Sequence, residues 1–116
     1  MKYVRLSLEQ ENLFEQDESK RYISRSRLGD IYHSMAEYAA AINEYRQALE
    51  MALGKDHPST LSTVHNMAIV FQDNGEYDMA LSWYRRALDG REMALGKNHP
   101  DTLATVHNMA IVFQDK

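Results

Sequence analysis

The sequence predicts an all-α protein made of antiparallel helical hairpins that stack side by side. The first observation is an internal duplication, because residues 51–73 recur as residues 93–115 with three substitutions, at an offset of 93 − 51 = 42. The second is a spacing of 3, 4 and 3 residues between apolar positions, which places them on one face of an α-helix. A unit of this length cannot bury its apolar face alone, so neighbouring units are expected to stack into an array.

Residues 58–99 form the clearest unit, with two helices joined by a turn. The first helix has its apolar stripe at Leu61, Val64, Ala68 and Phe71, with Met67 beside it. Asn74 and Gly75 tolerate positive φ and are expected to end this helix. The second helix has its stripe at Tyr77, Ala80, Leu81, Tyr84, Ala87 and Leu88 and is expected to stop at Gly96. Because the turn is short, the two helices should be antiparallel neighbours.

Residues 100–116 repeat the first helix of that unit and are predicted to be an incomplete third unit. Pro100 suits a first helical turn, since it has a fixed φ and no amide hydrogen to leave unpaired. The apolar stripe of this helix consists of Leu103, Val106, Ala110 and Phe113. No second helix follows to cover this stripe, so the sequence predicts self-association through these four residues, and a possible homo-oligomer.

Residues 20–57 are predicted to be the first complete unit, because Tyr38 and its neighbours match Tyr77 and its neighbours at an offset of 39. The offset is shorter by three because the triplet 90–92 has no counterpart after Glu50. Three helical residues correspond to about 4.5 Å and roughly 60° of rotation. The first two hairpins are therefore expected to stack at a different angle from the later pair.

Residues 1–18 are interpreted as a degenerate second helix of a preceding unit. Tyr3, Arg5 and Glu11 match Tyr84, Arg86 and Glu92 at an offset of 81. The carboxylates of this segment are more typical of a solvated end helix than of an interaction patch.

Composition and net charge limit which cellular compartments and which classes of partner are expected for this chain. A net charge of −4 attracts no phosphate backbone, so nucleic acid is not expected as a partner. No apolar run approaches the length that spans a bilayer, and the start has no signal-peptide block, so no membrane partner is expected. The chain has no cysteine, which agrees with a reducing compartment. These features predict a cytoplasmic protein.

Motifs for catalysis are missing from the sequence. It has no His-Glu-x-x-His pair, no glycine-rich phosphate loop and no Gly-x-Ser-x-Gly elbow. His57 and His99 each stand alone in a connection, whereas tetrahedral zinc needs several converging ligands. We therefore expect no enzyme activity, no metal and no cofactor.

The two hairpins resemble the tetratricopeptide repeat (TPR) signature. The residues that carry the resemblance are Leu28, Gly29, Tyr32, Ala41, Tyr45 and Ala48 in the first hairpin, and Met67, Ala68, Phe71, Gly75, Glu76, Tyr77, Ala80, Tyr84 and Ala87 in the second. The longer unit, with its ALGK(D/N)HP(S/D)T connection, resembles the 42-residue variant of kinesin light chains and of repeat arrays in large signalling NTPases. The resemblance implies a right-handed α-α superhelix (a TPR-like solenoid) whose first helices line a concave groove, and a non-catalytic scaffold that binds a protein or peptide.

The family's groove positions fall on a defined set of residues here. They include Arg27, Asp30, His33, His65, Asn66, Ile69, Gln72, His107, Asn108, Ile111 and Gln114. The amides of Asn66 and Asn108 can donate to and accept from a peptide backbone at once, or each can bond a neighbouring helix and fix the stacking. His65 and His107 either contact an acidic or aromatic ligand, with pH dependence near neutrality, or simply face solvent. The alternative to a peptide-binding scaffold is an assembly module that self-associates through its carboxyl-terminal helix.

Overall fold

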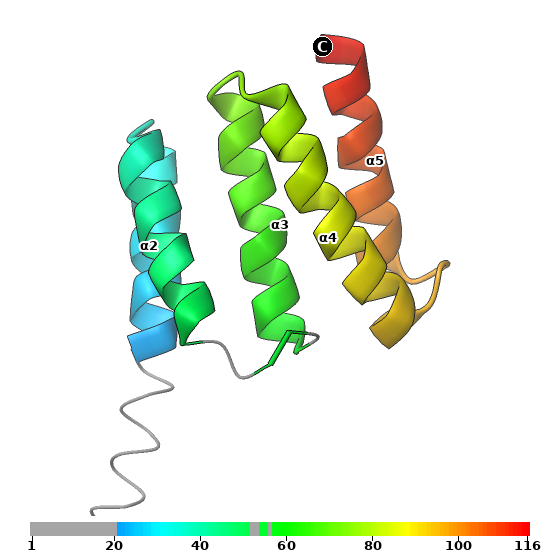
Figure 1. Cartoon of the computed structure of the whole chain (residues 1–116), viewed down its shortest axis with the longest axis horizontal. Helices are drawn as coiled ribbons and strands as arrows, with labels where there is room; N and C mark the ends of the chain where they lie inside the picture. Colours follow the sequence, from blue (N-terminus) through cyan, green and yellow to red (C-terminus); the bar gives the residue numbers. More distant parts are fainter. Residues whose placement is uncertain (1–20, 52–53, 56) are drawn as a thin grey trace, which may run out of the picture.

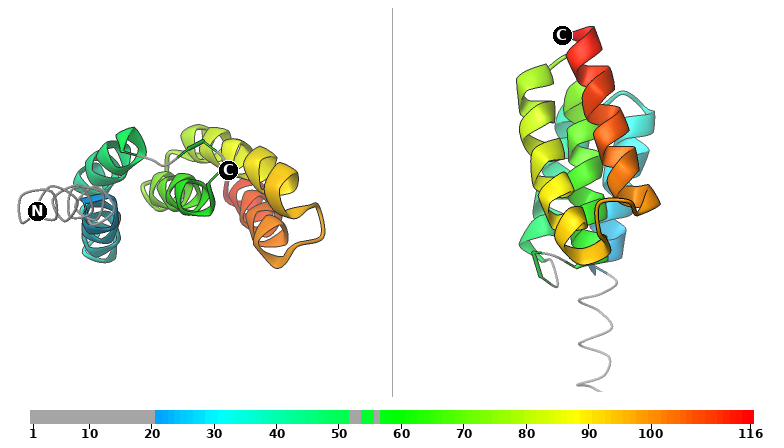
Figure 2. Two further views of the ribbon diagram at one scale, coloured as in Figure 1. Left: turned by 90° about the horizontal axis from the view of Figure 1, so that it is seen from below. Right: turned by 90° about the vertical axis from the view of Figure 1, so that its right-hand side faces the viewer.

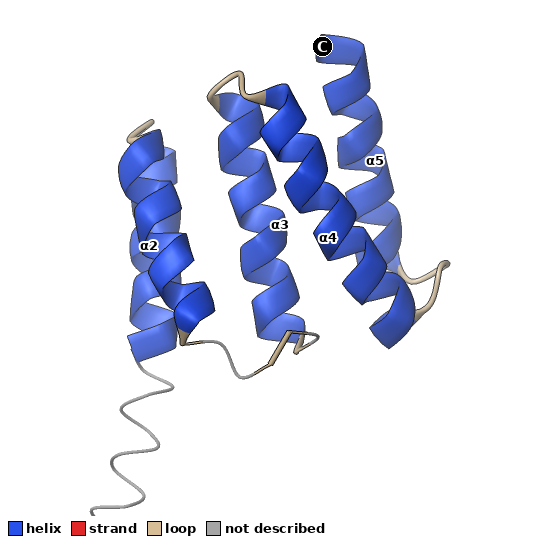
Figure 3. Cartoon of the chain, in the orientation of Figure 1, coloured by secondary structure: helices blue, strands red, loops and turns tan. Residues whose placement is uncertain are grey.

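A computed structural model describes residues 21–51, 54–55 and 57–116 of the chain. The predicted degenerate helix at 1–18 lies outside the described residues. All regular elements of the described part are helices, as Figure 3 shows, so the all-α prediction is confirmed. They are a helix at residues 21–34, α2 (Tyr38–Glu50), α3 (Pro58–Asp73), α4 (Tyr77–Leu95) and α5 (Pro100–Asp115).

The helices lie in two rows (Figures 1 and 2). Helix 21–34, α3 and α5 form one row, and α2 and α4 form the other. Helix 21–34 pairs with α2 and α3 pairs with α4 as antiparallel neighbours, which is the predicted hairpin arrangement. In the end-on view of Figure 2, α3 is set back between helix 21–34 and α5, so the row of first helices is curved.

Both hairpins turn in the same way. The N–H of Glu37 donates to the Tyr32 carbonyl at 2.8 Å, and the N–H of Glu76 donates to the Phe71 carbonyl at 2.8 Å. Such a bond, which spans five residues, closes a helix end when the residue before the donor has positive φ. Gly75 supplies that conformation with φ +78°, whereas the first hairpin uses Ala36 with φ +59°.

The histidine before each proline caps the helix that follows. Nδ1 of His57 accepts from the Ser59 N–H at 3.1 Å, and Nδ1 of His99 accepts from the Asp101 N–H at 3.1 Å. Each ring therefore satisfies one of the amide hydrogens that a helix start leaves unpaired. This local role accounts for both connection histidines.

The first helices have two packing faces. In α3, the predicted stripe Leu61, Val64, Ala68 and Phe71 is buried, together with a second set, Thr60, Thr63, Met67 and Val70. In α5, only the second set is buried, as Thr102, Thr105, Met109 and Val112. The buried set of α5 packs on the preceding hairpin, so the predicted stripe is the face meant for a following second helix.

The inserted triplet 90–92 lies inside α4, which ends at Leu95 with Gly96 beyond it, as predicted. Gly90 lies against Leu61, since a Cβ at this position would overlap the leucine side chain. Arg91 is buried. The different stacking angle of successive hairpins stays a prediction.

Candidate functional site

The predicted groove residues lie on the first helices, and we call their shared side the first-helix face. Their accessibility differs. Arg27, Asp30, His107 and Gln114 are exposed, whereas His33, Asn66, Ile69, Gln72, Asn108 and Ile111 are half-buried and His65 is buried. The described residues thus offer a mixed polar and apolar surface, but not all of its members are available to a ligand.

In the first unit, two of these side chains are held by the fold. The Tyr45 hydroxyl donates to the Asp30 carboxylate, and burial of the ring raises the pKa of Tyr45 further above its usual value. Nε2 of His33 lies 2.6 Å from a carboxylate oxygen of Asp73 on α3. Both contacts fix packing between helices, which leaves Arg27 as the exposed cation here.

His65 lies at the centre of a polar cluster between the second and third units, which we call the His65 cluster (His65, Arg91, Thr105 and Asn108). A guanidinium nitrogen of Arg91 lies 3.2 Å from Nδ1 of His65. The same nitrogen donates to Thr105 Oγ1 at 2.8 Å and to the Asp101 carbonyl at 3.1 Å. The side-chain amide of Asn108 lies 3.1 Å from Nε2 of His65. Three helix segments are thereby joined through one ring.

The partners of His65 determine its tautomer. A guanidinium only donates, so Nδ1 of His65 is the accepting nitrogen and Nε2 of the neutral ring carries the hydrogen. The amide of Asn108 can accept that hydrogen through its oxygen, because a half-turn of the group exchanges oxygen and nitrogen.

The ring of His65 is neutral at physiological pH. Burial, and secondly the charge of Arg91, lower the pKa of His65 from 6.5 to about 4. Burial also lowers the pKa of Arg91, while the Asp101 carboxylate opposes this shift. His65 therefore supports neither ligand contact nor a charge change near neutrality. Its repeat copy, His107, is exposed.

The two asparagines also differ. Asn108 is engaged by His65, which is the alternative in which the amide fixes the stacking. Asn66 is half-buried, and the hydrogen bonds of the described residues include none to its amide. Asn66 is thus the better candidate for a ligand contact.

A different set of residues makes the same junction between the first and second units. There, the Tyr22 hydroxyl lies 2.6 Å from Thr63 Oγ1. The same hydroxyl donates to the Ser59 carbonyl at 2.6 Å. Thr105 is the copy of Thr63. Its hydroxyl accepts a hydrogen bond from Arg91 of α4, whereas Thr63 contacts a tyrosine of a first helix. The inserted triplet therefore supplies a polar link that the shorter first unit lacks.

The predicted stripe of α5 is exposed, and we call it the α5 outer face (Leu103, Val106, Ala110 and Phe113). Leu103, Val106 and Phe113 are 51%, 46% and 61% exposed. Large apolar side chains that line up on one exposed helix face often mark an interaction site.

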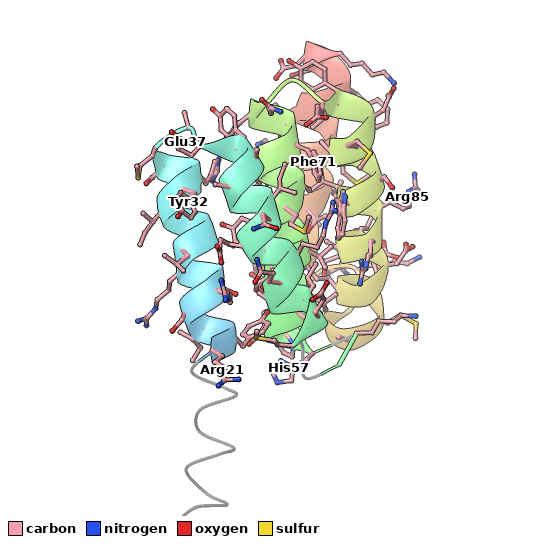
Figure 4. All side chains as sticks on the ribbon, turned by 60° about the vertical axis from the view of Figure 1, so that its left-hand side comes forward. Arg21, Tyr32, Glu37, His57, Phe71 and Arg85 are labelled. Atoms are coloured by element: carbon pink, nitrogen blue, oxygen red, sulfur yellow. The ribbon has the colours of Figure 1, made fainter. Side chains whose placement is uncertain are left out.

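A pocket of about 640 Å³ lies on the side of the second helices. Its lining consists of Lys55, Leu61, Ser82, Arg85, Arg86, Asp89, Gly90 and Met93. Arg85 projects outward from α4 in Figure 4, and the Arg86 guanidinium lies 5.2 Å from the centre of the Trp83 ring. Sequence reasoning missed this pocket, because the stripe pattern of α4 marks its buried side only.

The repeat pattern did not predict Arg91 as a site residue. Its place in the inserted triplet 90–92, which the first unit lacks, was the one signal in the sequence. The ring of Trp83 stacks on Phe71 of its own hairpin, with the ring centroids 6.4 Å apart. The described residues contain no group of three or more His, Asp and Glu side chains placed to hold a metal ion. Among the described helices, none has the length and apolarity needed to cross a membrane.

Comparison with known proteins identifies the family. The tetratricopeptide repeat model matches residues 21–93 and again 59–116. The chain belongs to the tetratricopeptide repeat family. Among solved structures, a putative kinesin light chain with nearly identical TPR-like repeats from Podosopora anserina superposes with a TM-score of 0.70 at 26% identity. The match covers 82% of this chain and 46% of that one, and it agrees with the predicted resemblance.

Other similar proteins have different contexts. BtubC (BKLC) from P. vanneervenii matches with a TM-score of 0.73 over 78% of this chain and 37% of that one, and its 17% identity shows the fold alone. The photosystem I assembly protein Ycf3 of Prochlorococcus marinus (strain MIT 9303) is 36% identical over 74 residues, or 63% of this chain. The same protein of Parasynechococcus marenigrum (strain WH8102) is 43% identical over 54 residues, or 46% of this chain. The matches span 41% and 30% of those two relatives.

Proposed function

We propose that this TPR protein is a non-catalytic scaffold whose first-helix face binds an extended peptide of a protein partner. The observation that carries the proposal is the pairing of Asn66 with Ile69, which lie almost one helical turn apart on α3, both half-buried. An amide can hold a peptide group by donating and accepting, while an isoleucine covers an apolar side chain. His107 and Ile111 continue this surface on α5.

The relatives support a binding role of this kind. Two of them carry an assembly function in their name, and assembly requires contacts with other proteins. For this chain we propose a protein partner, no nucleic acid or membrane partner, and a cytoplasmic location, on the basis of its net charge of −4 and its composition.

Peptides selected from a random linear library would test the proposal. Each selected peptide is titrated calorimetrically into the wild type, the Asn66→Ala variant and a control variant, Ser82→Ala, on the exposed side of α4. We expect Asn66→Ala to weaken binding about tenfold, as loss of a buried hydrogen bond does, and Ser82→Ala to leave it unchanged. Unfolding curves check that Asn66→Ala keeps the stability of the wild type. Equal affinities for all three proteins would refute the proposal. Asn108→Ala is a poor probe, because it also removes a partner of His65.

The second candidate is an assembly module that self-associates through the α5 outer face. The exposure of its large side chains favours this candidate. Sedimentation velocity over a range of concentrations should then show an oligomer that Val106→Asp converts to monomer. A monomer at every concentration up to the high micromolar range contradicts self-association.

A further inference from the structure

The pocket of about 640 Å³ on the side of the second helices has the size of a ligand site, since small-molecule sites occupy about 300–1,000 Å³. Lys55 lines it from the connection that precedes α3, and Leu61 lines it from α3 itself. The other lining residues belong to α4 and lie between Ser82 and Met93. The pocket is therefore formed inside the first two units, and neither the first-helix face nor the α5 outer face contributes to it.

The lining of the pocket is basic. Its charged residues are Lys55, Arg85, Arg86 and Asp89, three cations and one carboxylate, which gives a net charge of +2. The chain as a whole has a net charge of −4, so the pocket is opposite in sign to the protein around it. Charges of one sign that line a cavity raise the local concentration of ions of the other sign. The ligand that fits this lining is an anion.

The two arginines have donors available for an anion. The ion pairs of the described residues include none to Arg85 or Arg86, although Asp89 lies one helical turn after Arg85. The Arg86 guanidinium lies 5.2 Å from the centre of the Trp83 ring, and this cation–π contact orients the group without a hydrogen bond. The side chain of Arg85 projects from α4 (Figure 4). Guanidinium groups bind carboxylates and phosphates through two parallel hydrogen bonds.

The rest of the lining is mostly apolar. Leu61 and Gly90 pack directly against each other, because a Cβ on the glycine would overlap the leucine side chain. Met93 is 84% exposed, and its thioether is suited to contact with an aromatic ring. Ser82 adds one hydroxyl group. The pocket thus combines a cationic part with a part that can cover an apolar group.

The first unit lacks this combination. Gln47 occupies the position of Arg86 at the offset of 39, and the triplet that contains Gly90 has no counterpart there. The pocket is therefore a feature of the second unit and does not follow from the repeat pattern itself.

We propose that this pocket binds a phosphomonoester that carries an apolar or aromatic group. A phosphomonoester has a charge of about −1.5 to −2 at neutral pH and three acceptor oxygens. These properties match the net charge of +2 and the donors of two arginines and one lysine. A carboxylate or a sulfate ester has a single negative charge and leaves one cation unmatched. The apolar group of the ligand would lie on Leu61, Gly90 and Met93.

Phenyl phosphate serves as the probe, because it combines the phosphate group with an aromatic ring. It is titrated into the isotope-labelled full chain at low ionic strength, where screening is weak, and binding is followed by NMR chemical shifts of backbone amides and arginine side chains. The matched controls are phenyl sulfate, which has the same shape but one negative charge, and inorganic phosphate, which lacks the ring. We expect saturable shifts centred on the pocket residues and about tenfold weaker binding of each control.

Variants of the full chain locate the site. Arg86→Gln introduces the residue of the first unit and should weaken binding of phenyl phosphate about tenfold, because it removes charged hydrogen bonds. Lys55→Gln should also weaken binding, whereas its matched control Lys97→Gln should not, since Lys97 is the copy of Lys55 at the offset of 42 and does not line the pocket. Asn66→Ala should bind phenyl phosphate as the wild type does, so failure of this pocket and failure of the first-helix face are distinguished. Circular dichroism verifies that each variant is folded.

A phosphotyrosine peptide with glycine flanks distinguishes the two sources of such a group. If it binds as tightly as phenyl phosphate, the pocket accepts a phosphorylated residue of a partner protein. If phenyl phosphate binds and the peptide does not, the ligand is a small phosphorylated molecule.

Three results would overturn the proposal. The first is an absence of saturable shifts at the pocket residues, or shifts of equal size around Lys97, which would indicate unspecific attraction of anions. The second is equal affinity for phenyl phosphate and either control compound. The third is wild-type affinity in both Arg86→Gln and Lys55→Gln.

Discussion

Val64 and Val106 occupy the same position of the duplicated sequence, so the same substitution at both measures the covering helix directly. Val64 is fully buried beneath α4, whereas Val106 is 46% exposed on α5. Their neighbours in sequence are the same over at least one helical turn on each side, apart from one exposed position. We expect Val64→Ala to destabilise the protein clearly and Val106→Ala to have almost no effect.

The magnitude follows from the atoms removed. Each substitution deletes two methyl groups, and at about 0.8 kcal/mol for each buried group the loss at Val64 is about 1.6 kcal/mol, with a cavity contribution in addition. Alanine recovers roughly half a kcal/mol in either helix, since it has the higher helix propensity. The net cost is therefore about 1–2 kcal/mol at Val64. At Val106, half of the transfer term and no cavity term remain, so the net cost is near zero.

Urea denaturation followed by circular dichroism measures both variants against the wild type. A loss of about 1 kcal/mol corresponds to a decrease of roughly 4–8 °C in the melting temperature of a domain of this size, so thermal unfolding gives a second reading. Because the helix-propensity term is common to both sites, the difference between the variants reports burial alone.

An equal cost at the two positions would refute this reasoning. The cost at Val106 would then have to come from a cover on α5 in solution, and its dependence on protein concentration would reveal a second copy. A cost near zero at both positions would mean that α4 does not pack on α3 as described.

Three further predictions concern single sites. Ala36→Gly should raise the unfolding free energy by about 1 kcal/mol, since it relieves a positive φ at the position where the next hairpin has glycine, and a lowered urea midpoint would contradict this. Arg91→Met should weaken the docking of α5 by about 1.5–3 kcal/mol, because it removes charged hydrogen bonds to α5. The measurement is hydrogen exchange, which should become faster in α5. The control variant Arg86→Met, at an exposed site, should show wild-type exchange. Because the folded pKa of His65 is about 4 and the unfolded value 6.5, the unfolded chain binds the extra proton between these values. Stability should therefore fall as the pH falls from about 6.5 to about 4, and this slope should be flatter in His65→Gln.

Periodicity was sufficient to predict the hairpins. The stripe from Leu61 to Phe71 is buried as expected, and the turn at Gly75 and the stop at Gly96 are where the sequence places them. These features are local, because spacing along a helix and tolerance of positive φ depend on neighbouring residues only.

The second packing face and the His65 cluster could not be predicted in this way. Thr63 and Thr105 are polar, so a search for apolar spacing passes over them, yet both are buried and bonded across a unit boundary. His65 and His107 occupy equivalent positions of the duplicated sequence, so the sequence alone does not distinguish their environments. His65 is buried because Arg91 and Tyr84 of its own unit and Asn108 of α5 lie beside it, and the contact with α5 depends on the following unit.

Position in the array therefore decides what a repeated residue does. His65 and Phe71 are followed by further helices and become packing residues, whereas His107 and Phe113 have the same local sequence and remain accessible. A groove inferred from repeat positions alone overcounts ligand residues wherever another unit follows. Among the predicted groove residues of α3, the side chain with the strongest case for binding is that of Asn66, whose amide has no hydrogen bond within the described residues.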